Sequence, residues 1–480
     1  MERLNINKSL VLLTLYIQLV LFILIILVSY IKGFDFSYDF YHYLLAIIFF
    51  ECVLISTIDK IFNIYQIFLF MMFLFNVGLP IFVLFNLFDY PPGNRILFGD
   101  GMETVISKET LSQTYLVITL MLLGSSVGWL IGTLKFKINI KRSILIKSTG
   151  NKYEKNLKKL FYILLLLVIY KNIELVYNSI IYGYVEVMHL QSLNLKISYV
   201  LIIADILFKM SGYALLFLSK NSKQYVKYSI LFMIPYSIQI FAGARGETIA
   251  VLLTIIFIYS KFYKKINLKK LVPSAFLILI FSTAFGIYRF TRDFGSLISE
   301  ISIPKLLSLG IISNSSSMGV IAYTIELKDQ FFNKIPFLFG YVQGIFSFAP
   351  NYTLEGIQNK NYLAQHLTYL LNSDKLYRGS TIGTSMGAEF YEFSNGNFFL
   401  IFILSILLLY VTCYFISRLN KNVFMFYLGA LFLELLWLSP RGSIMKIFNK
   451  ESLFSLVILI FVVYLSRVVI KSKKTRNIHN

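Results

Sequence analysis

The chain has 480 residues, of which 57% are hydrophobic and only 14% are charged, and its formal net charge is +21. Soluble domains carry about 25% charged residues, so this composition excludes a soluble globular fold. Apolar runs long enough to cross a bilayer core, which takes about 20 residues as a helix, recur along the chain. The sequence therefore predicts an all-α polytopic membrane protein.

About twelve membrane spans are expected in chain order. The first, near residues 9–31, is too long for a signal-peptide core and lacks a small-residue cleavage site, so we expect a retained anchor. The others lie near residues 41–58, 64–88, 111–134, 160–181, 197–218, 229–243, 247–260, 271–288, 398–416, 423–438 and 452–470.

The excess positive charge is concentrated in seven segments that lie outside the spans. Together they hold 26 Lys and Arg against 3 acidic residues; the segments are near residues 1–8, 59–60, 135–159, 219–228, 261–270, 417–422 and 471–480. Such a bias marks cytoplasmic loops rather than a nucleic-acid surface, and alternate crossings place all seven on one side. We therefore expect a multi-pass protein of the bacterial cytoplasmic membrane, with both termini in the cytoplasm and no nucleic-acid partner.

The stretch from Ser229 to Ser260 has cytoplasmic-type charge on both flanks, so it must cross the membrane an even number of times. Its 32 residues give about 48 Å of helix, whereas two passes through a ~30 Å core need about 60 Å. This length predicts a short hairpin whose tip, Gly243–Glu247, lies below the outer surface in a cavity.

A long loop, residues 289–397, separates the ninth and tenth predicted spans and is expected outside the cell. Ile298–Ile311, Met318–Glu326 and Tyr362–Leu371 have amphipathic helical patterns, and long ordered loops usually carry function. The chain thus divides into nine helices with the short hairpin (1–288), the large loop (289–397), and three helices with a basic tail (398–480).

Several ionisable residues fall inside the spans, where charge is costly. Lys171 and Glu174 are three residues apart, and Asp205 and Lys209 are four apart, so each pair is expected to meet on one helix face. Glu51 and Glu434 have no such local partner. We expect them to pair between helices or to border a cavity.

Four arginines are expected near the outer membrane boundary. The guanidinium group presents a rigid fork of donors that suits a diphosphate. Anchoring to anionic headgroups, or pairing with Glu247 and Asp293, is the alternative. The four are Arg245 at the hairpin tip, Arg289 and Arg292 after the ninth span, and Arg441 after the eleventh.

The loop segment from Arg378 to Phe393 is rich in small residues, which let a ligand approach the backbone closely. Glu389 and Glu392 lie one helical turn apart in it, and either can accept a proton from a sugar hydroxyl. The alternative is that Gly and Ser only cap a helix while both glutamates are solvated. His366 is the second candidate base, as the only histidine of the loop.

Tyrosines of the loop can stack on sugar rings, although membrane-interface aromatics explain them equally well. They are Tyr341, Tyr352, Tyr362, Tyr369, Tyr377 and Tyr391. Cys52 and Cys413 fall inside spans and offer neither a disulfide framework nor a zinc spacing. With no Walker loop, HExxH, Rossmann fingerprint or Asp-x-Asp pair, we expect no cofactor and no metal.

With these residues in view, the chain resembles the Wzy-type O-antigen and capsule repeat-unit polymerases over nearly its whole length. The resemblance is carried by the span count, the late external loop and the Gly243-Ala244-Arg245-Gly246-Glu247 turn before an apolar helix. It is also carried by Gly379-Ser380 and Ala388-Glu389-x-Tyr391 before a span. Many family members continue with Asn-Phe-Gly, where this chain reads Glu392-Phe393-Ser394-Asn395-Gly396.

The resemblance implies a metal-independent, membrane-integral glycosyltransferase. Its donor would be a glycan on undecaprenyl diphosphate, its acceptor a lipid-linked repeat unit, and its pathway partners a chain-length regulator and a flippase. The site residues implied are Arg245, Arg289, Arg441 and Arg292 around the diphosphate, with Glu389 or His366 as base.

Two other classes remain open from the sequence. A flippase for lipid-linked oligosaccharides fits twelve spans with intramembrane charges, but it does not predict a long loop on one side. A ligase or a polyprenyl-phosphate-sugar transferase is the second alternative, the latter with Asp35 or Asp39 as base.

Overall fold

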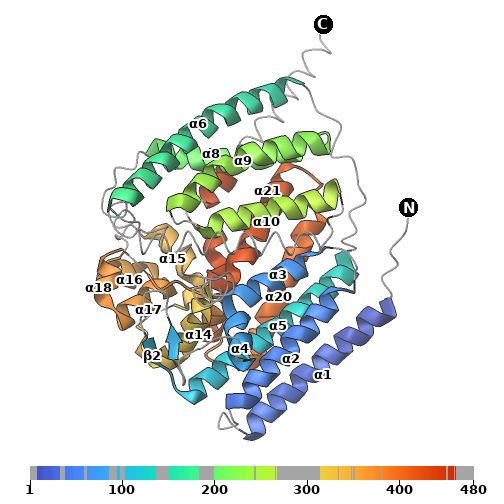
Figure 1. Ribbon diagram of the computed structural model, residues 1–480, viewed down its shortest axis with the longest axis vertical. Helices are drawn as coiled ribbons and strands as arrows, with labels where there is room; N and C mark the ends of the chain where they lie inside the picture. Colours follow the sequence, from blue (N-terminus) through green and yellow to red (C-terminus); the bar gives the residue numbers. More distant parts are fainter. Residues whose placement is uncertain are drawn as a thin grey trace, which may run out of the picture.

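The structure is a computed structural model. It describes residues 8–32, 38–58, 62–85, 95–97, 103–136, 151–182, 199–242, 245–264, 266, 314–332, 335–347, 349, 352–379, 381–449, 452–458 and 460. Within these residues the protein is a bundle of long helices, with a group of short helices at one end (Figure 1).

The long helices agree with the predicted spans. They are α1 (Lys8–Lys32), α2 (Tyr38–Ser56), α3 (Ile64–Met72), the π-helix η1 (Phe73–Val77), α4 (Gly78–Leu84), α5 (Lys108–Phe136), α6 (Asn151–Tyr182), α8 (Tyr199–Phe217), α9 (Ser222–Ala242), α10 (Arg245–Phe262), α20 (Phe398–Ser417) and α21 (Val423–Leu438). Eight helical runs among the described residues are long and apolar enough to cross a membrane. The polytopic helical fold is therefore confirmed. The predicted span 271–288 and most of 452–470 lie outside the described residues.

The hairpin formed by α9 and α10 is longer than predicted. The two helices contain 21 and 18 residues, which is about 32 and 27 Å of helix. Both extend into the basic flanks, since α9 begins at Ser222 and α10 ends at Phe262. The predicted bounds of the hairpin were therefore too short, and the depth of its tip stays a prediction.

Helix α5 forms the centre of the bundle and makes its most extensive contact with α20. Three glycines one turn apart permit this contact. A Cβ atom at Gly124 or Gly128 would collide with the backbone oxygen of Phe402 or Ile406, and one at Gly132 would collide with Cys413. Small residues at this spacing let helix backbones approach closely in membrane proteins. By contrast, α1 and α6 lie at opposite edges of the bundle (Figure 1) and expose apolar side chains as a lipid-facing surface requires.

The described part of the large loop is a compact group of short helices. They are α14 (Ser316–Glu326), η2 (Lys328–Gln330), η3 (Phe337–Phe339), α15 (Gly340–Phe346), α16 (Leu354–Lys360), α17 (Leu363–Leu371), α18 (Ser373–Tyr377) and α19 (Met386–Phe393). The helical predictions for Met318–Glu326 and Tyr362–Leu371 are confirmed, and Ile298–Ile311 lies outside the described residues. A two-stranded antiparallel pair, β1 (Arg95–Leu97) and β2 (Glu103–Val105), precedes α5 and was not predicted.

The loop helices pack on the end of the bundle where α5 and α20 begin and α21 finishes (Figure 1). After α21, two 3₁₀ turns, η4 (Ser439–Arg441) and η5 (Ile444–Phe448), contact α19 and α15, respectively. Side chains from the loop and from the last described helices therefore meet at this end.

Candidate active site

Helix α19 is fixed by a cap and by close packing. The side chain of Ser385 accepts a hydrogen bond from the backbone N–H of Gly387, which satisfies an otherwise unpaired donor of the first turn. A Cβ atom at Gly387 would lie 2.7 Å from Ile321 on α14 and 2.8 Å from the sulfur of Met121 on α5. The small residues of this segment thus let α19 sit directly on both helices.

Glu389 of α19 is buried, with 2% of its surface exposed. The hydroxyl of Ser443 donates to its Oε2 at 3.0 Å, and the hydroxyl of Thr384 lies 3.3 Å from its Oε1. Burial raises the pKa of Glu389 to about 8, against the opposing effect of these bonds and of the Ile444 N–H. A base with a pKa near the working pH is well matched to proton transfer. The alternative of a solvated glutamate is wrong for Glu389.

Glu392, one turn further along α19, has a different environment. Its Oε2 accepts a hydrogen bond from the backbone N–H of Phe337 at 2.9 Å, and the residue is half-buried. The two carboxylates share a helix, as predicted, but only Glu389 contacts the turn after α21.

Aromatic side chains lie next to the buried carboxylate. The ring of Tyr341 on α15 lies 4.7 Å from that of Tyr362. Burial and the charge of Glu389 raise the pKa of Tyr341, so this phenol stays neutral. A neutral aromatic ring therefore lies within electrostatic range of the buried carboxylate.

Arg441 lies in η4, two residues before the Ser443 that binds Glu389. It is exposed, its Nη1 donates to Asn314 Oδ1 at 3.2 Å, and its guanidinium carbon lies 5.7 Å from the ring centre of Phe75. The turn after α21 therefore brings one predicted arginine to the same end as Glu389.

Arg245 is the first residue of α10, and its side chain is not among those described. The next residue, Gly246, lies beside Leu438, since a Cβ atom there would be 3.6 Å from Leu438 Cδ2. Leu438 is the last residue of α21 and precedes Arg441 by one turn, so α10 begins beside the end of α21 that leads to Arg441. Arg289 and Arg292 lie outside the described residues.

His366 lies in the packing of the loop. It is 1% exposed, its ring centre is 4.6 Å from that of Phe332 and 4.7 Å from that of Phe337, and its Nε2 lies 3.1 Å from the Ile357 oxygen. Burial lowers its pKa to about 4, so the ring is neutral. These contacts are those of a packed core histidine.

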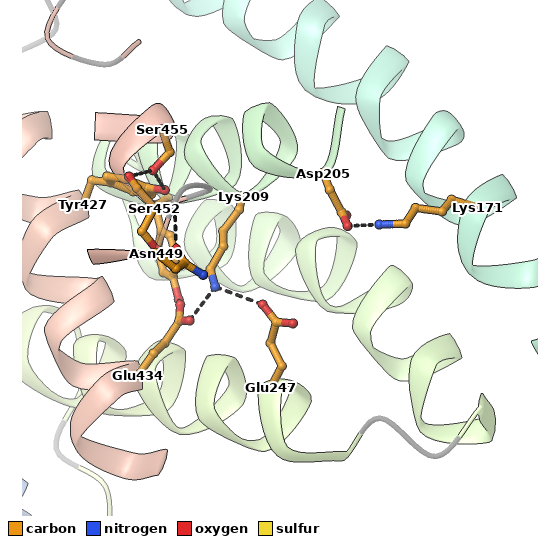
Figure 2. A network of polar contacts seen from close by, with 10 residues as sticks. Lys171, Asp205, Lys209, Glu247, Tyr427, Glu434, Asn449, Ser452 and Ser455 are labelled. Carbon is orange, nitrogen blue, oxygen red and sulfur yellow. Dashed lines mark hydrogen bonds and ion pairs between the residues drawn. The ribbon is translucent and has the colours of Figure 1, made fainter. Parts of the chain in front are cut away.

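A charge network joins three helices beside this end of α21. The Lys209 ammonium on α8 lies 2.6 Å from Glu434 on α21 and 3.1 Å from Glu247 on α10 (Figure 2). The Tyr213 hydroxyl also donates to Glu434. The prediction that Glu434 pairs between helices is confirmed. Glu51 is similar, since Gln18 on α1 donates to it at 2.7 Å.

The predicted pairing along single helices was wrong. Lys171 on α6 pairs with Asp205 on α8, and not with Glu174, while Lys209 turns away from Asp205 toward the other two helices (Figure 2). The spacings do place each pair on one face, but a carboxylate on a neighbouring helix is closer to each ammonium.

Sequence reasoning missed several members of these sites. Thr384 lies inside the small-residue segment, and Ser443 follows the Ser439–Gly442 turn, so the signal for both was their position next to residues already selected. Among the described residues, no group of three His, Cys, Asp or Glu side chains is placed to hold a metal ion.

A family model for the O-antigen polysaccharide polymerase Wzy matches residues 13–474, nearly the whole chain. No curated protein and no solved structure matches the chain. Because the match extends across both the helix bundle and the loop, the chain belongs to the Wzy family of O-antigen polysaccharide polymerases, which join lipid-linked oligosaccharide repeat units in a membrane.

Proposed function

We propose that the protein couples undecaprenyl-diphosphate-linked repeat units at the outer face of the cytoplasmic membrane, with Glu389 as the catalytic base. The observation that carries this proposal is the buried carboxylate of Glu389, held by Ser443 and Thr384 where the loop meets the helix bundle.

The reaction requires one proton transfer and one charge to be stabilised. A hydroxyl of the acceptor attacks the anomeric carbon of the donor, a C–O bond forms, and the bond to undecaprenyl diphosphate breaks. Glu389 takes the hydroxyl proton, and the diphosphate departs with its negative charge. The 3.3 Å contact of Thr384 with Oε1 is longer than that of Ser443 with Oε2, so an acceptor hydroxyl replaces Thr384 more readily.

The departing diphosphate is bound by arginine side chains. Arg441 is exposed at this end of the bundle. Gly246, the residue after Arg245, lies beside the Leu438 side chain, one turn before Arg441. Two guanidinium forks meet the two phosphates without a metal ion or other cofactor. We also assign Arg289 and Arg292 to the arginines that bind the diphosphate, because they directly follow the ninth predicted span.

A coupling assay in a chelating buffer tests both the arginines and the absence of a metal. Purified wild-type protein with lipid-linked repeat units and EDTA is expected to form a ladder of products. Arg245→Ala or Arg441→Ala should slow coupling by about 10²–10³-fold, the effect of losing one donor to a developing charge. Arg378→Ala, which removes an exposed arginine between α18 and α19, is the matched control. Wild-type rates in both variants, or a ladder that needs added Mg²⁺, would contradict the proposal.

The proposed orientation has both termini in the cytoplasm and the loop outside. It is supported by the basic segments 219–228 and 417–422, which lie at the ends of α9 and α20 away from the loop helices. Alkaline phosphatase fused at Asn361 is therefore expected to be active, and the same enzyme fused at Lys421 inactive. The reverse pattern would place the site in the cytoplasm and end the proposal.

A chain-length regulator and a flippase of the same pathway are the proposed partners, besides the lipid-linked glycans and the bilayer. Their role follows from the reaction, since repeat units have to reach the outer face before they are coupled. No comparison favours the chain itself as the flippase.

A further inference from the structure

A hollow lies at the C-terminal end of α19, next to η2. It is a cavity of about 100 Å³ lined by Lys328, Asp329, Phe331, Tyr391, Glu392 and Asn395. One water needs about 10–15 Å³ of such space, so the cavity has room for several waters or one sugar ring.

The lining has the chemistry of a saccharide site. Of the two aromatic residues in the lining, Tyr391 is 4% exposed and Phe331 is half-buried, so Phe331 is the ring that can contact the C–H face of a pyranose. Asp329, Glu392 and Asn395 supply acceptors for its hydroxyl groups, and Asn395 also supplies donors. With two carboxylates against one lysine, the cavity disfavours a phosphate or an acidic sugar.

Two hydrogen bonds hold the walls of the cavity in place. The Tyr391 hydroxyl donates to Gln113 on α5 at 3.3 Å, and Glu392 accepts the Phe337 N–H at 2.9 Å. A site whose shape exists before the ligand arrives loses less ordering entropy on binding.

The backbone at the end of α19 is unusual. Asn395 has a φ of 50° and Gly396 a φ of 77°, two left-handed residues in succession. Asn tolerates this conformation better than most residues, at some cost in strain. A Cβ atom at Gly396 would lie 3.3 Å from the Tyr391 hydroxyl, so the turn packs directly on that ring. The strained turn keeps Asn395 at the cavity.

We propose that this cavity is a saccharide subsite that takes one neutral or amino-sugar residue of the lipid-linked repeat unit. The inference rests on the proposed function, because Tyr391 and Glu392 lie within one turn of Glu389 on the same helix. The base and part of the lining of the cavity therefore lie on one short helix. The subsite selects the repeat unit, while Glu389 performs the proton transfer.

Two conservative variants test the subsite. Asp329→Asn removes a charge from an exposed residue, and Phe331→Leu removes an aromatic face, so neither should disturb the fold. Each is expected to raise the KM for the lipid-linked acceptor by about tenfold with little change in kcat, the pattern of lost ground-state binding. Asp374→Asn and Phe346→Leu, exposed residues of the same loop, are the matched controls.

A binding measurement separates this inference from the catalytic proposal. The probe is the free repeat-unit oligosaccharide, cleaved from its lipid and titrated calorimetrically into purified protein. Glu389→Gln protein is expected to bind it as wild type does, and Asp329→Asn protein about tenfold more weakly. Equal binding by wild type and both cavity variants would overturn the subsite and leave the polymerase mechanism standing. Weaker binding in the cavity variants, with normal chain extension by Glu389→Gln, would retain the subsite and reject the base.

Discussion

Replacing Glu389 by Gln is expected to slow chain extension by about 10²–10⁴-fold, the range attributed to a positioned general base. The surface glycan should collapse from long chains to single repeat units, while the amount of inserted protein stays normal. Gln has the shape of the protonated carboxyl, which is the main form below a pKa of about 8, and its amide oxygen still accepts from Ser443. The fold should therefore survive the change.

The control for this variant is Glu355→Gln, which alters an exposed carboxylate of α16 in the same loop. It is expected to extend chains as wild type does. Long chains made by Glu389→Gln at a normal rate would show that another group takes the proton, and the proposed mechanism would fail.

The pH dependence of kcat/KM also tests the assignment of Glu389 as the base. The active form of Glu389 is the carboxylate, so kcat/KM should rise with pH up to about 8 and level off above it. Ser443 donates to the carboxylate and lowers its pKa, so Ser443→Ala should raise that pKa and move the rising limb to higher pH. The rise of kcat/KM with pH should be absent in the Glu389→Gln protein. A limb at the same pH in wild type and Ser443→Ala would contradict the role of this contact.

The largest effect on stability is expected from Lys209→Met, which should lower the free energy of unfolding by about 3–5 kcal/mol. The change removes the only ammonium that contacts both Glu434 and Glu247 among the described residues. The Glu434 side chain is only 8% exposed, so it is left as an unpaired buried charge, the costliest outcome for a broken buried ion pair. Thermal unfolding of the purified protein in detergent measures the loss.

Lys171→Met is the matched control. It breaks the ion pair between α6 and α8, in which the Asp205 side chain is 33% exposed. It should cost clearly less, because water still reaches that carboxylate. A double-mutant cycle completes the test: Glu434→Gln should be less destabilising in the Lys209→Met background than alone. Equal effects of Lys209→Met and Lys171→Met, or full additivity with Glu434→Gln, would show that the network is not coupled.

The helix bundle was largely predictable because bilayer thickness fixes the length of an apolar run. The predicted spans near 398–416 and 423–438 match α20 and α21 almost residue for residue. The polar ends of the helices were less predictable. Helix α6, for example, begins at Asn151, within a basic segment. Charged side chains at helix ends reach the interface, and so the helix continues where the hydropathy has already fallen.

The sites were only partly predictable. Glu389 stands out in the sequence by its small-residue surroundings, but its partner Ser443 comes 54 residues later, after two membrane helices. The Lys209 pairs show the same limit, because spacing gives the face of a helix and not the helix that lies opposite. His366 was selected for its chemistry alone, and only tertiary packing against Phe332 and Phe337 shows that it is enclosed.

The glycine contact between α5 and α20 determines how firmly the helix that carries Glu389 is supported. Gly124, Gly128 and Gly132 leave no space between the two backbones, so these helices cannot slide without a steric clash. Helix α19 leads into α20 across a short turn, and α14 packs on α5, so the wall that carries Glu389 stands on a rigid spine. The position of Glu389 is therefore set by the membrane helices on which α19 rests, and not by the loop alone.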